Sequence, residues 1–214
     1  MEITTEIVKQ LRDKTGVSIM QCKKALEETR GDVDKAVLVL LKKSAGVAEK
    51  KQGRTLGAGI VEAYVHNTQK VGAMVELLCE TDFVAKGEEF KKLARDIAMQ
   101  ISATNPQFLK REDIDEKSAT LANEMFVKEM EADSKGAGKP EGVEPVGAEL
   151  ASVVPEEIKA KILAGKLDAY WGERVLLEQA FIKNPDLTIR NLIDSAVQKF
   201  GEKIELSRFT RFAI

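Results

Sequence analysis

Several residue types that mark common classes of function are scarce in this 214-residue chain. It has two cysteines, Cys22 and Cys79, whose separation fits neither a disulfide framework nor a metal-ligand spacing. The formal net charge is only −2, so we expect no basic surface for nucleic acid or for an anionic membrane. No stretch approaches about eighteen apolar residues, and no signal-peptide pattern opens the chain. We therefore expect a cytoplasmic, reduced protein that binds a protein or a small ligand.

The chain also offers little for catalysis. His66 is the only histidine, and Cys79 is the only thiol nearby that it could activate. If residues 67–70 form a hairpin turn, the two side chains are separated by roughly 26 Å of strand, far beyond hydrogen-bond reach. There is no Gly-x-x-x-x-Gly-Lys-Ser/Thr loop for phosphates and no Cys/His cluster for zinc. We expect no catalytic residue, no bound metal and no cofactor.

Residues 1–50 have the pattern of three short amphipathic helices. Thr4 or Thr5 can cap the first helix, Ser18 the second and Asp32 the third. Each segment then repeats apolar residues at helical spacing. These are Ile7, Val8 and Leu11, then Ile19, Cys22, Ala25 and Leu26, then Val33, Ala36, Val37, Leu40 and Leu41. Because helices of this length are not stable singly, we expect them to share one small core in a compact domain.

The third helix is expected to end at Gly46, after which the composition turns to Lys, Gln and Gly. We interpret residues 51–58 as a linker and residues 59–214 as a core domain. The predicted fold class is α+β: an N-terminal three-helix domain, then an antiparallel sheet core with packed helices and a helical hairpin.

A β-hairpin opens this core. Gly59–His66 and Val71–Cys79 have strand character, and residues 67–70 form the turn between them. In the second strand the alternate residues Val71, Ala73, Val75 and Leu77 are expected to form one buried face. Apolar residues at helical spacing then predict a helix over residues 88–103. They are Phe90, Leu93, Ala94, Ile97, Ala98 and Ile101. The junction between the hairpin and this helix carries Thr81-Asp82-Phe83, which we call the tip.

The tip allows two interpretations. Thr81 or Asp82 can cap the following helix, because either side-chain oxygen can accept a bond from a backbone N–H of the first turn. Phe83 can then fold back onto that turn as a hydrophobic staple. Alternatively, it is an anchor for another protein, since a ring buries on the order of 200 Å² when it enters a pocket. Its position alone does not decide between the two.

Residues 110–170 predict a projecting helical hairpin. A polar helix runs from Arg111 to about Ala132, a mobile turn covers residues 133–147, and a return helix starts at Pro155 and ends near Tyr170. Such a hairpin can equally be a peripheral packing element with no binding role.

The C-terminal part predicts two strands around a helix. Residues 173–178 favour a short strand, Thr188 begins a helix that ends at Gly201, and Ile204–Ile214 is rich in strand formers.

Two stretches resemble the signatures of translation elongation factor Ts. Residues 76–86 contain Thr-Asp-Phe-Val followed by a small and a basic residue, with Leu78 where the family usually has Asn. Residues 11–26 match the other signature in the Leu-Arg pair, in the Thr-Gly turn and in the final Lys-Lys-Ala-Leu sequence. Further family-like residues are Leu176 to Gln179 with Phe181, Arg208-Phe209 and Arg211-Phe212; Ala180 replaces the usual proline. The resemblance spans nearly the full length.

The resemblance implies a guanine nucleotide exchange factor of translation elongation, which is not an enzyme. It implies binding to elongation factor Tu, both GDP-bound and nucleotide-free, and GDP release by displacement of Mg²⁺ and of the elements that hold the phosphates. Thr81, Asp82, Phe83 and Val84 are the implied contact residues for this displacement.

The resemblance further implies that the three-helix domain is ubiquitin-associated-like and rests on the GTP-binding domain of elongation factor Tu. Arg12, Ile19 and Met20 are then contact candidates, although Arg12 is equally a solvated charge and the other two equally pack the second helix. Any contact made by the C-terminal module of longer relatives should be absent here. The short family form sometimes pairs, which allows a homodimer or a 2:2 complex. The alternative function is an adaptor, in which the three-helix domain binds a protein ligand and the rest only dimerises.

Overall fold

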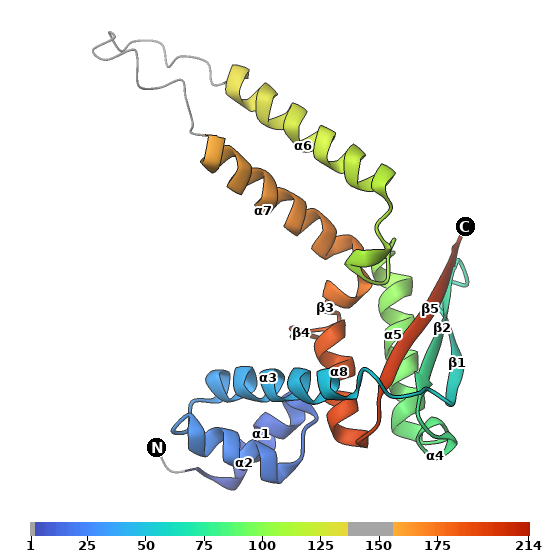
Figure 1. Cartoon of the computed structure of the whole chain (residues 1–214). Coiled ribbons are helices and arrows are strands. Elements are labelled where there is room, and N and C mark those ends of the chain that lie inside the picture. The colour runs from blue at the N-terminus through green and yellow to red at the C-terminus, as the bar shows by residue number, and fades with distance from the viewer. Residues whose placement is uncertain (1–2, 137–155) are drawn as a thin grey trace.

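A computed structural model of the chain describes residues 3–136 and 156–214. Within these ranges, helices pack against one face of a small antiparallel sheet, which confirms the predicted α+β class (Figure 1). No helix in the described part combines the length and the apolar character needed to cross a membrane.

The three N-terminal helices are α1 (Thr5–Thr15), α2 (Ile19–Glu28) and α3 (Val33–Lys51). Their caps are Thr4, Ser18 and Asp32, and each accepts a bond from a backbone N–H three residues ahead, as predicted. The helices enclose a separate core cluster. It comprises Val8, Leu11, Val17, Cys22, Ala25, Leu26, Ala36 and Leu40.

The prediction that the third helix ends at Gly46 is wrong, because α3 continues to Lys51. A glycine inside a helix costs only about 1 kcal/mol, which packing can offset. Here Val47 and Ala48 pack against the main core, the larger buried cluster around the sheet, and the Ser44 hydroxyl donates to the side-chain oxygen of Gln198 on α8 (Ile189–Phe200). The end of α3 is therefore held against the rest of the chain.

The predicted hairpin is confirmed. It consists of β1 (Ala58–Val65) and β2 (Val71–Cys79), which pair antiparallel, with Ala58 opposite Cys79 and Val65 opposite Gly72. The C-terminal strand β5 (Ile204–Ala213) pairs with the other edge of β2, so the sheet order is β1-β2-β5. Alternate residues of β2 face the core, as the sequence pattern predicts. They are Ala73, Val75, Leu77 and Cys79.

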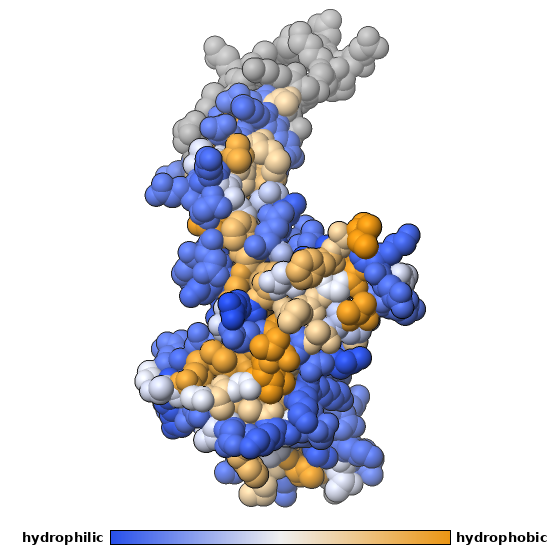
Figure 2. Space-filling model, turned by 90° about the vertical axis from the view of Figure 1, so that its right-hand side faces the viewer, coloured by the Kyte–Doolittle hydropathy of each residue, from blue (hydrophilic) through white to orange (hydrophobic). Residues whose placement is uncertain are grey.

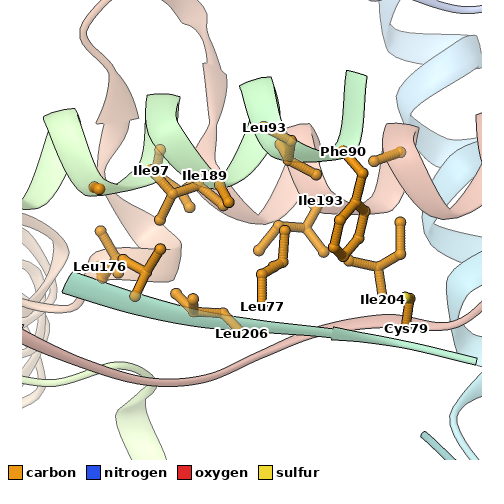
Figure 3. Close-up of a cluster of buried hydrophobic side chains, with 14 of the residues drawn as sticks. Leu77, Cys79, Phe90, Leu93, Ile97, Leu176, Ile189, Ile193, Ile204 and Leu206 are labelled. Carbon is orange, nitrogen blue, oxygen red and sulfur yellow. The ribbon is translucent and has the colours of Figure 1, made fainter. Parts of the chain in front are cut away.

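Two helices cover the inner face of this sheet: α5 (Glu88–Thr104) and α8 (Ile189–Phe200). Figure 3 shows how side chains from both helices converge on those of the sheet, with Phe90 standing over Cys79 and Ile204. The predicted apolar stripe of α5 is buried as expected. It comprises Phe90, Leu93, Ala94, Ile97, Ala98 and Ile101. The sheet, α5 and α8 thus form one rigid platform.

Two long helices, α6 (Glu116–Gly136) and α7 (Glu156–Arg174), run side by side away from this platform (Figure 1). A short 3₁₀ turn, η1 (Arg111–Asp113), precedes α6 where the sequence predicted helix, since the Asp115 side chain caps the helix from Glu116. Residues 133–136 are helical rather than part of a turn. The remainder of the predicted turn and Pro155 lie outside the described residues.

The short strand predicted at residues 173–178 is wrong. Helix α7 continues to Arg174 and is followed by a 3₁₀ turn, η2 (Leu176–Glu178), because Val175 and Leu176 face two different buried clusters rather than a sheet. A small hairpin follows that the sequence pattern did not indicate, made of β3 (Ala180–Phe181) and β4 (Asn184–Thr188). As predicted, Thr188 then caps α8.

Candidate functional site

The tip follows directly from the end of β2. Thr81 has an extended backbone conformation and caps α4 (Asp82–Ala85), a single helical turn, by accepting a bond from the Val84 N–H at 3.5 Å. Gly87 is the N-cap residue of α5, which begins at Glu88. Figure 1 places α4 at the end of the sheet opposite the C-terminus. The platform therefore carries the tip on a rigid strand and a rigid helix.

Phe83 is the most exposed aromatic side chain of the described residues, at 85%. Its neighbours Val84 and Ala85 are buried in the main core, at 7% and 5% exposure. Two buried residues therefore fix the turn while the ring points away from it. This geometry differs from the hydrophobic staple, in which the ring would be covered by the following helix.

Asp82 is also exposed and is paired with Lys86 one turn later. The Lys86 Nζ lies 2.5 Å from the Asp82 carboxylate, and this hydrogen bond is the main cause that lowers the pKa of Asp82. Asp82 therefore stays ionised at neutral pH. An ionised carboxylate beside an exposed ring gives the tip one directed polar group and one apolar group.

The structure also reveals a support for the tip that sequence reasoning missed. The Thr81 N–H and hydroxyl both donate to the carboxylate of Glu202, at 3.0 Å and 2.6 Å. From the other side, the Cys79 thiol donates to the Thr81 carbonyl at 3.1 Å. Glu202 is 121 positions away in the sequence, so no local motif could have identified it.

The other contact candidates lie on the three-helix unit. Arg12 is an exposed residue of α1, and Ile19 and Met20 open α2 with 57% and 69% exposure. Ile19 was expected in the buried stripe of its helix, but the buried positions begin at Cys22. The structure thus leaves these three side chains available. It does not join them to the tip, because α8 lies between the two groups (Figure 1).

The thiol–histidine pair considered from the sequence is not formed. The backbone N–H of His66 donates to the Val71 carbonyl at the turn of the hairpin, whereas Cys79 pairs with Ala58 at the opposite end. Cys79 is buried, and burial is the main cause that raises the pKa of its thiol. A protonated, enclosed thiol is a poor nucleophile.

Acidic, histidine and cysteine side chains do not gather into a metal-binding group within residues 3–136 and 156–214. A cleft of about 520 Å³ lies between α8 and β5 and is lined by residues including Asp194 and Ile204 rather than by the tip. The 85% exposure of Phe83 means that the tip projects from the surface, which suits it to entering another molecule.

An exposed ring and a carboxylate on a turn fixed by buried residues are typical of a surface that contacts another macromolecule. A protein-family model described as "Elongation factor TS" matches residues 2–214. The chain belongs to the elongation factor Ts family, whose members are nucleotide exchange factors of elongation factor Tu in translation elongation.

Individual relatives agree over almost the whole chain. It is 43% identical to "Elongation factor Ts" of Carboxydothermus hydrogenoformans over 99% of this chain and 89% of that protein. It is 44% identical to the protein of the same name from Thermodesulfovibrio yellowstonii, over 100% of this chain and 97% of the relative. The corresponding protein of Desulfotalea psychrophila is 42% identical, with 100% and 99% covered.

Proposed function

We propose that this chain binds elongation factor Tu carrying GDP, in the cytoplasm, and accelerates GDP release through the tip. The observation that carries the proposal is the 85% exposure of Phe83 on a turn whose next two residues are buried. Exposure of a large apolar ring to water is unfavourable in free energy, and burial of the ring in a partner's pocket would remove this penalty. In this proposal the ring enters between two helices of the partner's GTP-binding domain.

The three tip residues and Val84 would each have a different role. Phe83 acts as wedge and anchor, Asp82 makes a directed polar contact, and Thr81 and Val84 place them. Entry of the wedge shifts the partner elements that hold Mg²⁺ and the phosphates. Because the metal is the main counter-charge to the phosphates, its loss weakens nucleotide binding. The exchange factor performs no covalent chemistry and holds no cofactor.

The binding of GDP and the binding of this chain to elongation factor Tu affect each other reciprocally. If this chain weakens GDP binding to elongation factor Tu, bound GDP weakens binding of this chain by the same factor. The chain therefore binds the nucleotide-free form most tightly, and incoming GTP can displace it.

We propose residues 1–50 as a ubiquitin-associated-like domain that makes a second contact with the GTP-binding domain, joined through residues 51–58 to the core domain of residues 59–214. The exposure of Ile19 and Met20 supports this contact, since an unbranched methionine adapts well to a binding surface. Arg12 adds a charge on the neighbouring helix. In this arrangement the N-terminal contact supplies affinity, and the tip supplies the exchange rate.

A titration separates these roles. Elongation factor Tu loaded with fluorescent GDP is mixed with increasing amounts of this chain and excess unlabelled GDP, and the release rate is fitted to a maximum and a half-saturating concentration. Met20→Asp should raise the half-saturating concentration with little change in the maximum, whereas Phe83→Ala should lower the maximum. Binding without any acceleration of release by the wild type would favour the adaptor instead.

We also propose that the outer face of the sheet pairs with a second copy of the chain, giving a homodimer and a 2:2 complex with the partner. Exposed apolar side chains gather there. They are Val61, Val65, Met74 and Phe212. The register makes them neighbours: Gly72 lies opposite both Val65 and Phe212. Figure 2, viewed from the side of the sheet, shows hydrophobic surface across the middle of this face.

The measurement for this pairing is the mass of the protein by sedimentation equilibrium. The wild type is expected to be a dimer. Met74→Lys is expected to be a folded monomer, because pairing would bury one lysine charge from each copy at the interface. A wild-type monomer throughout the concentration range would contradict the pairing.

A further inference from the structure

The loop of residues 201–203 joins α8 to β5 and lies against the junction of β2 and α4. Its central residue, Glu202, uses both carboxylate oxygens on one residue of that junction. Oε2 accepts the Thr81 backbone N–H at 3.0 Å, and Oε1 accepts the Thr81 hydroxyl at 2.6 Å. Hydrogen bonds to an ionised acceptor are shorter and stronger than neutral ones. The carboxylate therefore holds both the backbone and the side chain of Thr81.

The same loop also donates a hydrogen bond to the residue that follows the strand carrying the tip, in addition to accepting hydrogen bonds through Glu202. Glu80 accepts the Lys203 backbone N–H at 2.5 Å and the Arg54 guanidinium at 3.1 Å. The bond from Lys203 is the first cause that lowers the pKa of Glu80, followed by burial in the opposite sense and by Arg54. In addition, Lys51 at the end of α3 donates to the Gly201 carbonyl. The loop is thus anchored to α3, to the segment after it and to the strand that carries the tip.

This arrangement supplies a bond that the tip's own sequence lacks. In a capping box, the side chain of the third helical residue reaches back to the N–H of the capping residue. In α4 the third helical residue is Val84, which is buried and has no polar atom in its side chain. Glu202 provides the missing acceptor from a distant part of the chain.

We propose that Glu202 is a positioning residue for nucleotide exchange, which fixes Thr81 and thereby aims Phe83 at the partner. Thr81 sets the direction of α4, and Phe83 is the second residue of that single turn. A rotation of Thr81 therefore displaces the ring. Holding the ring in its binding orientation before contact removes part of the ordering cost of binding. The proposal rests on the exchange function proposed above.

A role for Glu202 as one half of a surface ion pair does not fit its contacts. Its carboxylate makes no ion pair with any lysine or arginine in the described part of the chain. The neighbouring Glu205 does make one, with Lys203 at 3.0 Å, and it does not touch the tip. Glu205→Ala is therefore a matched control, since it removes the same charge from the same part of the chain.

The test compares Glu202→Ala, Glu202→Gln and Glu205→Ala in the full-length chain, using release of fluorescent GDP from elongation factor Tu. Losing two charge-assisted hydrogen bonds should lower the maximal release rate of Glu202→Ala by about tenfold. Glu202→Gln keeps one acceptor oxygen and should fall by only about threefold. Glu205→Ala should match the wild type. The half-saturating concentration should stay within about twofold in all three, because the N-terminal contact is intact.

Hydrogen–deuterium exchange of the peptide around residues 80–86 supplies a readout independent of the partner. It should be faster in Glu202→Ala than in wild type and unchanged in Glu205→Ala. If Glu202→Ala fails to fold, Glu202→Gln carries the comparison, because it keeps the shape of the side chain. A wild-type maximal rate in folded Glu202 variants would overturn the positioning role, as would a fall equal to that of Glu205→Ala.

The two levels of the proposal fail in different ways. If the wild type does not accelerate GDP release, the exchange function itself is wrong. If the wild type accelerates release and Phe83→Ala abolishes the effect, but Glu202→Ala behaves as wild type, only the positioning role is wrong.

Discussion

Gly46→Ala should stabilise the protein, because Gly46 lies inside α3 rather than at its end. A Cβ built at Gly46 meets nothing within 4 Å, and the residue does not need a left-handed backbone. In a helix interior, alanine is more favourable than glycine by about 1 kcal/mol of folding free energy. For a chain of this size, that difference raises the melting temperature by about 2–4 °C.

The assay is thermal unfolding followed by far-ultraviolet circular dichroism, with Gly16→Ala as the matched control. Gly16 ends α1 with φ +69°, a left-handed conformation that costs a residue with a Cβ about 1–2 kcal/mol. The two substitutions add the same methyl group, yet they should shift the melting temperature in opposite directions. An unchanged or lowered melting temperature for Gly46→Ala would refute the continuous helix and restore the predicted end of the third helix at Gly46.

Two further predictions concern the platform under the tip. Ile97→Ala removes a fully buried side chain of α5 and should destabilise the fold by about 2–5 kcal/mol in urea unfolding, whereas a loss below about 1 kcal/mol would mean that the core is not packed there. Burial raises the pKa of Asp194, an effect that Arg190 partly offsets, so the charged form destabilises the folded state. That penalty is absent below the unfolded pKa of about 4 and complete above the folded pKa. Asp194→Asn should therefore have a higher melting temperature than wild type at neutral pH and the same melting temperature as wild type in acid. If the two proteins have the same melting temperature at neutral pH as well, the direction of the pKa shift is contradicted.

The elements that the sequence predicted well are those specified by local chemistry. The limits of the β1–β2 turn follow from strand alternation interrupted by polar residues, and the caps at Ser18, Asp32 and Thr188 follow from side chains that can bond a nearby N–H. The apolar stripe of α5 is visible from spacing alone. In each case the residues that decide the structure lie within one or two turns of each other.

The errors arose where distant contacts decide. The end of α3 is held by α8 and by the core, so a local helix breaker at Gly46 is overridden. Val175 to Leu177 is a short apolar run, for which periodicity does not separate a strand from a buried turn. The exposed orientation of Phe83 depends on how Val84 and Ala85 pack, and the Glu202 support depends on chain pairing across the fold.

In the proposed mechanism Phe83 is the group that drives exchange, and one comparison tests this role directly. Release of fluorescent GDP from elongation factor Tu is measured at saturating wild type, Phe83→Ala and Leu121→Ala, the last being another exposed apolar side chain, at 66%, on α6. Loss of a buried aromatic anchor costs about 2–4 kcal/mol, a rate decrease of roughly 30-fold to 1000-fold. The account predicts this decrease for Phe83→Ala alone, with its circular dichroism spectrum unchanged. Release by folded Phe83→Ala as fast as by wild type would contradict it.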